Sequence, residues 1–173
     1  MSSAHNDVVE LILKDHRRME ELFRTMRNAE ADRAGALAEF ANLLIAHGEA
    51  EEEKVYPDLA RRDPVDEDDV EHGVHEHQEG NEALLALLEI ADTSSEAWDE
   101  KLEDLVAAVT HHLDEEERTL LNDAREHVPD ARRAELAEAF VRSRAEHLEA
   151  ACGSPANVRA VVERGKREGK SED

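Results

Sequence analysis

Residues 102–120 read LEDLVAAVTHHLDEEERTL, and this stretch decides the fold. Its apolar residues recur every three or four positions, which predicts an amphipathic helix with one face toward a core. His112 and Glu116 belong to the same series, between Val109 and Leu120. Residues four apart share one helix face, so the imidazole and the carboxylate are expected to point inward together. A buried carboxylate is costly unless a partner compensates its charge.

Three other stretches repeat the pattern. Helices are expected from about residue 6 to 28, from 32 to 60, and after the acidic run 66–69, and each has a histidine on its apolar stripe. The second of them also carries a glutamate four residues after its histidine. The order His, His-x-x-x-Glu therefore occurs twice, which suggests two cations with two histidines each and bridging glutamates. The candidate metal ligands are His16, His47, Glu51, His77, His112 and Glu116.

The fold predicted from these helices is all-α. Because the connections are short, consecutive helices should form an antiparallel up-down four-helix bundle. Asp32 is expected to cap the second helix, Asp63-Pro64 to form a turn, and Thr93 with Glu96 to open the fourth helix as a capping box. An additional C-terminal helix should pack alongside. The sequence predicts it over 130–150, with apolar contacts from Leu136, Phe140 and Val141.

The domain organisation follows from this pattern. Residues 1–150 are expected to form one domain, made of the bundle and its fifth helix. Residues 151–173 are expected to be a partly disordered tail, with a short helix from about Val158.

Charge and composition exclude several classes of partner. A net charge of −23 argues against nucleic acid and against anionic membrane surfaces. Cys152 is the only cysteine, so no internal disulfide forms, and this fits a reducing compartment. The N-terminus lacks a signal-peptide pattern and no segment is apolar enough to span a bilayer, so a cytoplasmic location is expected. The oligomeric state is not predicted.

The same residues carry a family resemblance. The chain resembles the hemerythrin-like HHE cation-binding family over about its first 125 residues. The segments that carry it are KDHRRMEELF from Lys14, HGEAEEEKVYPDL from His47, HEHQEGNEALLALL from His75 and HHLDEEERTLL from His111. The resemblance implies a bundle holding two iron ions, oxo- or hydroxo-bridged, that binds or senses dioxygen, nitric oxide or iron. Some members of the family decompose hydrogen peroxide.

The sequence departs from the oxygen-carrying hemerythrins at one ligand position. Those proteins have a further histidine one turn before the third-helix ligand, where this chain has Gly73. His72 and His75 are the nearest histidines and could reach only through a distorted helix. Tyr56-Pro57 matches a Tyr-Pro pair common in the family, so the Tyr56 phenolate is a further candidate metal ligand. Regular helix geometry places Tyr56 away from Glu51, and the alternative is a flanking aromatic residue.

Several alternatives stay open from the sequence. Imidazole and carboxylate ligands suit iron, manganese or zinc. The function is either the binding or sensing of dioxygen, nitric oxide or peroxide, or a catalase-like decomposition of hydrogen peroxide; a metal-free scaffold leaves the buried glutamates unexplained. Asn81 is the one residue expected to orient a ligand, His77. The remaining histidines are expected at the surface: His5, His72, His75, His111, His127 and His147.

Overall fold

The fold is a helical bundle. The structure is a computed structural model of the chain, and it describes residues 6–62 and 65–171, over which no strand occurs. Asp63-Pro64 and His5 therefore lie outside the described residues. The helices are α1 (Val8–Met26), α2 (Arg33–Ala50), the π-helical segment η2 (Glu51–Val55), α3 (Tyr56–Ala60), α4 (Glu67–Leu88), α5 (Glu96–Arg118), α6 (Leu120–His127), α7 (Asp130–Glu149) and α8 (Pro155–Arg167).

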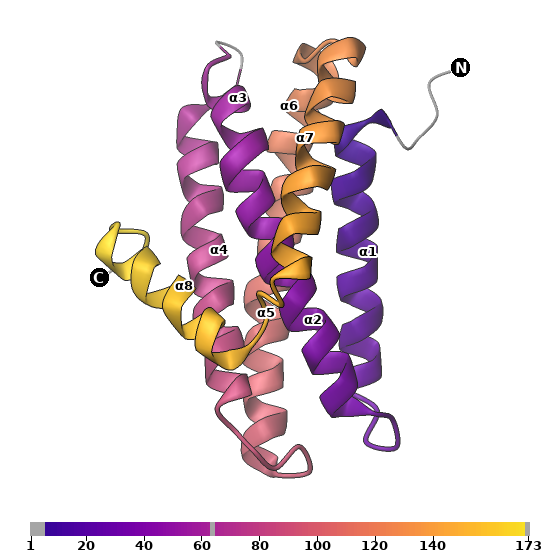
Figure 1. Cartoon of the computed structure of the whole chain (residues 1–173), viewed down its shortest axis with the longest axis vertical. Coiled ribbons are helices and arrows are strands. Elements are labelled where there is room, and N and C mark those ends of the chain that lie inside the picture. The colour runs from indigo at the N-terminus through magenta and orange to yellow at the C-terminus, as the bar shows by residue number, and fades with distance from the viewer. Residues whose placement is uncertain (1–5, 63–64, 172–173) are drawn as a thin grey trace.

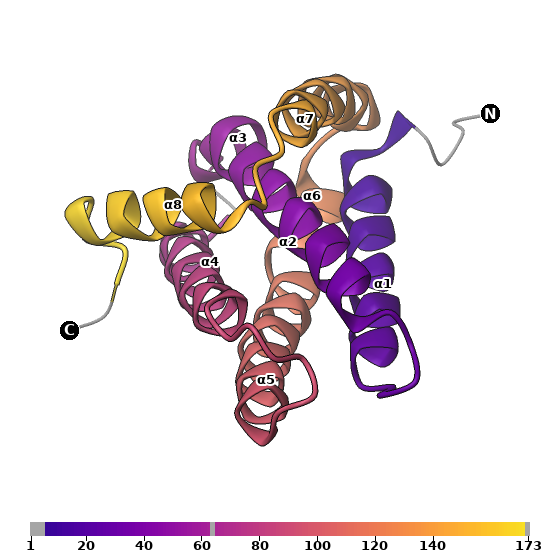
Figure 2. The same cartoon turned by 60° about the horizontal axis from the view of Figure 1, so that its bottom comes forward.

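The long helices lie side by side along the long axis, and loops at alternating ends join them (Figure 1). Helix α1 packs on α2, α4 packs on α5, and further contacts join α1 to α5 and α2 to α4. Helix α7 covers α2 and α1 from outside, while α8 crosses α4 (Figure 2). None of the helices in the described parts of the chain is long and apolar enough to cross a bilayer.

Side-chain caps set where the helices begin. The Asp32 carboxylate accepts a hydrogen bond from the Gly35 amide at 2.9 Å, as predicted. The predicted Thr93 cap is wrong: Ser95 caps α5, and its hydroxyl accepts from the Trp98 amide at 3.1 Å. Thr93 lies in a turn, and its carbonyl instead accepts from Arg33 at 2.9 Å.

Two apolar clusters fill the interior, one toward each end of the bundle. One contains Met19, Phe40 and Trp98, and the other contains Ile12 and Phe140. In α1, His16 lies between Ile12 and Met19, so the polar layer separates the two clusters. Full burial of such side chains stabilises a fold by about 1.5–3 kcal/mol each, which offsets the cost of the polar groups between them.

One π turn interrupts the second helix. Pro57 has no amide hydrogen, and its ring would clash with the carbonyl four residues earlier in a regular α-helix. The wider turn from Glu51 to Val55 accommodates it, and the Tyr56 amide donates to the Glu51 carbonyl. The extra residue in this turn rotates Tyr56 onto the face that carries Glu51.

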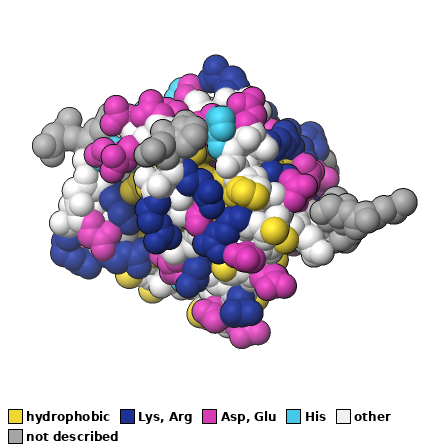
Figure 3. Space-filling model, turned by 90° about the horizontal axis from the view of Figure 1, so that it is seen from above, with side chains coloured by type: hydrophobic (Ala, Val, Ile, Leu, Met, Phe, Trp, Pro, Cys, Tyr) yellow, Lys and Arg dark blue, Asp and Glu magenta, His cyan; other side chains and the backbone are white. Residues whose placement is uncertain are grey.

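The outer helices are fixed by specific contacts. Leu136 and Phe140 of α7 are buried as predicted, but Val141 is 47% exposed because it faces away from the bundle. At the upper end, Arg132 of α7 pairs with Asp58 of α3 at 2.7 Å, and Arg133 pairs with Asp7 at 2.9 Å. Seen from above, Lys and Arg side chains are interspersed with Asp and Glu over this end (Figure 3).

The described chain after α7 forms one further helix, which is longer than the short helix expected from about Val158. Helix α8 begins at Pro155, is capped by the hydroxyl of Ser154, and continues to Arg167. Its valines are buried against α4, and Gln78 of α4 donates to the Val162 carbonyl at 3.0 Å. Beyond the helix, Lys170 pairs with Glu52 at 2.9 Å, so this segment reaches the edge of the polar layer.

Candidate metal centre

Six side chains converge in the polar layer between the apolar clusters. They come from α1, α2, η2, α4 and α5, and all six are buried. Each histidine directs its Nε2 atom toward a glutamate. These are the six residues that the sequence pattern singles out: His16, His47, Glu51, His77, His112 and Glu116.

Glu116 lies between two histidines on different helices. Its Oε1 atom is 3.1 Å from His16 Nε2, and its Oε2 atom is 3.5 Å from His112 Nε2. The spacing of four residues within α5 brings His112 to Glu116, and the packing of α1 on α5 brings His16 to it. One carboxylate therefore offers one oxygen to each of two imidazoles.

Glu51 has the corresponding position on the other side of the layer. Its Oε1 atom is 2.9 Å from His47 Nε2 and 3.2 Å from His77 Nε2. Ligand atoms within 4.8 Å of one another form two groups that share Glu116. One group is Glu51, His77, His112 and Glu116, and the other is His16, His47 and Glu116.

The atoms that face the middle of the layer have no hydrogen-bond partner. This holds for Nε2 of three histidines, for both Glu51 oxygens and for Glu116 Oε1. Buried polar atoms in proteins are nearly always paired, so a convergent set of unpaired ones is unusual. Imidazole nitrogens and carboxylate oxygens are also the ligands that iron, manganese and zinc take. The residues present therefore fit a pair of metal cations.

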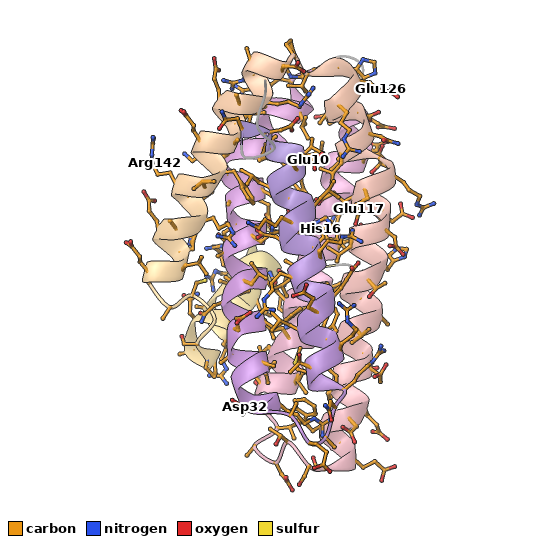
Figure 4. The ribbon with its side chains drawn as sticks, turned by 90° about the vertical axis from the view of Figure 1, so that its right-hand side faces the viewer. Glu10, His16, Asp32, Glu117, Glu126 and Arg142 are labelled. Atoms are coloured by element: carbon orange, nitrogen blue, oxygen red, sulfur yellow. The ribbon has the colours of Figure 1, made fainter. Side chains whose placement is uncertain are left out.

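Four further carboxylates hold the outer nitrogens of the histidines. A carboxylate can only accept, so each Nδ1 carries the proton and each Nε2 is left free to bind a metal. Figure 4 shows one of these pairs, His16 of α1 beside Glu117 of α5. We call these four residues the outer carboxylates. They pair as Asp15 with His47 (2.9 Å), Glu52 with His77 (2.9 Å), Glu76 with His112 (3.3 Å) and Glu117 with His16 (3.2 Å).

The outer carboxylates form a closed ring around the bundle. Each is adjacent in sequence to one candidate ligand but binds the histidine of the next helix. A carboxylate of α1 thus orients the histidine of α2, and one of η2 orients the histidine of α4. In the same way a carboxylate of α4 orients the histidine of α5, and one of α5 orients the histidine of α1. Every imidazole is oriented by a helix other than its own.

Arginine and lysine side chains farther from the centre donate hydrogen bonds to three of the outer carboxylates. Arg144 of α7 donates to both Asp15 oxygens at 2.8 Å. Arg17 donates to Glu117 Oε1 at 2.6 Å, and Lys170 donates to Glu52 at 2.9 Å. Helix α7 supplies no candidate ligand, but its Arg144 holds Asp15, which binds the candidate ligand His47. Phe140 of α7 also packs edge-on against the His47 ring, with ring centroids 5.6 Å apart.

The buried charges shift the pKa values of the layer. Burial opposes a charge on His47, but Glu51 and Asp15 outweigh burial and raise the His47 pKa to about 10. Burial also opposes the charge of Glu52, yet His77 and Lys170 lower its pKa to about 2. Without metal, His47 is thus protonated at neutral pH beside the carboxylates of Glu51 and Asp15.

Tyr56 reaches the centre through the π turn. Its hydroxyl donates to Glu116 Oε2 and lies 3.4 Å from His77 Nε2. Its ring stacks on His77, with centroids 5.4 Å apart and planes at 7°. The missing side chain of Gly73 makes room for this ring, since a Cβ there would lie 3.1 Å from the Tyr56 hydroxyl. Tyr56 therefore occupies the space beside Gly73, with its hydroxyl in the polar layer.

A small cavity of about 20 Å³ adjoins the layer. His47, His77 and His112 form its polar side, and Met19 and Val109 are among its apolar walls. The volume suffices for about one water-sized molecule. A ligand of two or three atoms is the size class that this space admits.

One expectation about the surroundings of the centre needs correction. Asn81 lines the cavity but makes no hydrogen bond to His77, whose Nδ1 binds Glu52 instead. Neither His72 nor His75 fills the place beside Gly73: His72 faces Glu76 on the surface, and His75 contacts the Lys170 carbonyl. Glu76 itself is only 4% exposed, because α5 covers it.

The comparison with protein families agrees with this geometry. Residues 7–124 match the family model described as "Hemerythrin HHE cation binding domain". No curated protein and no solved structure gives a significant match. The matched range contains all six candidate ligands and the four outer carboxylates. Arg144, in α7, and Lys170, after α8, lie beyond it.

Proposed function

Because the chain belongs to the hemerythrin HHE cation-binding family, we propose that its polar layer holds two iron ions and binds a small ligand there. The scaffold for this function is an antiparallel up-down four-helix bundle of α1, α2–α3, α4 and α5–α6. Residues 1–150, which include α7, form the domain that carries it. His16 and His47 would hold one iron, His77 and His112 the other, and Glu51 and Glu116 would bridge them.

The observation that carries this proposal is the set of unpaired buried atoms. Six carboxylates lie in or around the layer: Asp15, Glu51, Glu52, Glu76, Glu116 and Glu117. Among the residues that the structure describes, the permanent positive charges paired with them are those of Arg17, Arg144 and Lys170. Two metal cations would supply further positive charge, and the unpaired nitrogens and oxygens of the layer would bind them.

The choice of iron rests on the ligand set and the family. A structural zinc site is closed by four ligands, whereas this layer offers six with two shared carboxylates. Iron and manganese accept such mixed sets and higher coordination numbers. Tyr56 is a seventh candidate ligand, because its hydroxyl lies against Glu116 and His77 in the space beside Gly73.

The cavity supports a small molecule as the physiological ligand. Bound iron supplies Lewis-acid and redox chemistry to a ligand that reaches it. The chain's own residues limit that ligand by size, since Met19, Leu44 and Val109 leave about 20 Å³ beside the histidines. Dioxygen, nitric oxide or peroxide fits this space.

The test begins with the metal. The purified protein should contain two irons per chain, and its near-ultraviolet spectrum should extend beyond the protein band if an oxo bridge is present. His112→Ala should lower the iron content, whereas His127→Ala, which removes an exposed histidine from the same chain, should not. A metal-free protein whose stability is unchanged in Glu51→Ala would contradict the proposal.

The ligand is tested on the iron-loaded protein. Under reducing, oxygen-free conditions, nitric oxide should change the spectrum, and the change should be lost in His112→Ala. The alternative, catalase-like decomposition of hydrogen peroxide, is tested by adding peroxide and measuring oxygen with an electrode. Rapid oxygen evolution that is lost in His112→Ala would support this alternative over a binding function.

A further inference from the structure

A second group of metal-binding side chains lies at the surface beside the centre. His72 and Glu76 are one turn apart on α4, and His111 faces them from α5. Glu76 Oε2 is 3.1 Å from His111 Nε2 and 3.6 Å from His72 Nε2. None of these three residues is a candidate ligand of the buried irons.

Glu76 is the residue that makes this group unusual. Its side chain is buried, and Oε2 has no hydrogen-bond partner. Its other oxygen, Oε1, accepts from His112 Nδ1 at 3.3 Å. The two imidazoles, by contrast, are largely exposed, at 53% and 61% of their side-chain surfaces. A solvated cation can therefore reach them, and the unpaired oxygen of Glu76 points at the place where it would bind.

The other exposed groups of this kind lack that feature. In the group of Glu49, Glu53 and His147, Glu49 is already paired with Arg164 at 2.6 Å and Glu53 accepts from Ser143 at 2.8 Å. The group of Asp123, Glu126 and His127 lies at the surface and has one imidazole. Neither contains a buried carboxylate oxygen without a partner.

We propose that His72, Glu76 and His111 form a third cation site, at the surface, for a divalent first-row transition metal ion. Two imidazoles and one carboxylate, with further positions open to water, are a set that Zn²⁺ and Fe²⁺ accept. Glu76 then joins this site to the buried layer, since its two oxygens face the surface imidazoles and His112. The site goes beyond the proposed function and does not depend on it, because it uses none of the buried ligands.

The experiment uses Zn²⁺, which has no redox chemistry. It is titrated by calorimetry into the full chain after the buried centre has been loaded with iron. Wild-type protein should bind one zinc per chain at the surface without releasing iron. Loss of even an outer partner of a metal ligand costs about tenfold or more in affinity, so His72→Ala and His111→Ala should each weaken zinc binding by at least about tenfold. Both variants change exposed residues and should fold normally.

His127→Ala is the matched control, because it removes one imidazole from another exposed group. It should leave zinc binding unchanged. Equal loss in this control, or unchanged binding in His72→Ala/His111→Ala, would overturn the site. If the protein takes up no iron, the proposed function fails but this test still runs. The metal-free wild type should then bind one zinc more per chain than the double variant.

Discussion

The carboxylate of Asp15 lies 2.9 Å from Nδ1 of His47, on a different helix, and Arg144 holds it there from α7. Replacement by asparagine keeps the shape but removes the charge that strengthens this hydrogen bond. Loss of such an outer partner costs about 10–100-fold in metal affinity, and Asp15→Asn should lower iron affinity by that amount. Competition with a chelator measures it. Glu10→Gln, which removes an exposed acid from the same helix, is the control and should have no effect.

Arg144 acts on the centre only through Asp15. Arg144→Met keeps much of the side-chain volume but removes both hydrogen bonds to Asp15. Its effect on iron affinity should be smaller than that of Asp15→Asn, because Asp15 can still accept from His47. In the double variant the two losses should not add, since residues in one hydrogen-bond network are coupled. Additive losses in the chelator assay would refute a route through Asp15.

The metal-free protein should be most stable in mildly acidic solution. The His47 pKa is raised from 6.5 to about 10, so its contribution is complete below pH 6.5 and is lost as pH rises toward 10. The Glu52 pKa is lowered from 4.5 to about 2, so its contribution is complete above pH 4.5 and is lost as pH falls toward 2. Thermal unfolding should therefore show a maximum between pH 4.5 and 6.5.

The iron-loaded protein is the control for that pH dependence. Its imidazoles are neutral because they bind metal, so the loss of stability above pH 6.5 should be much smaller than in the metal-free protein. Identical alkaline profiles for the two forms would show that His47 is not a ligand.

Tyr56→Phe tests whether Tyr56 is a seventh metal ligand. A phenolate bound to ferric iron absorbs visible light, and phenylalanine cannot bind iron. The substitution should abolish any visible band of the iron-loaded protein while the iron content stays at the wild-type value, since six ligands remain. A spectrum identical to wild type would show that Tyr56 only donates a hydrogen bond to Glu116.

Gly73→Ala should destabilise the fold despite the better helix propensity of alanine. The new Cβ would lie 3.1 Å from the Tyr56 hydroxyl and 3.3 Å from its ring. Overpacking costs about 1–3 kcal/mol, against a gain of about 0.5–1 kcal/mol for replacing glycine within a helix, so the net loss should be about 1 kcal/mol. Denaturant unfolding measures it, and the loss should shrink in the Tyr56→Phe background.

The spacing of apolar residues predicts which side chains share one face of a helix. It predicted that His16, His47, His77 and His112 face inward and that Glu51 and Glu116 join them, and the structure brings the six together. The type and order of the helices also follow from the apolar stripes and the short loops. The start of α5 does not follow from them, because Ser95 and Thr93 are both good capping residues. Which of the two caps the helix depends on the contact between Thr93 and Arg33.

The outer carboxylates were not predictable in this way. Each is one residue from a ligand and so points about 100° away around its helix. On a single helix, Asp15 or Glu52 therefore looks like an ordinary surface acid. Only the packing of neighbouring helices places each one against an imidazole. Adjacency to a ligand was the available signal, but it could not tell which histidine each carboxylate would bind.

The position of Tyr56 could not be predicted from the sequence for a different reason. Its inward position contradicts regular α-helical geometry, and the π turn that corrects it arises from the clash at Pro57. The sequence Tyr-Pro contained the cause, but the size of the rotation depends on where the bundle lets the helix widen.

The ring of outer carboxylates has a consequence for how the protein acquires its metal. No pair of helices contains a complete, oriented half of the centre, because each histidine is bound by a carboxylate from the preceding helix and α5 supplies the carboxylate for α1. A chain in which only two helices are docked thus leaves at least one imidazole of each half without its carboxylate. We therefore expect tight metal binding only after all four helices have docked.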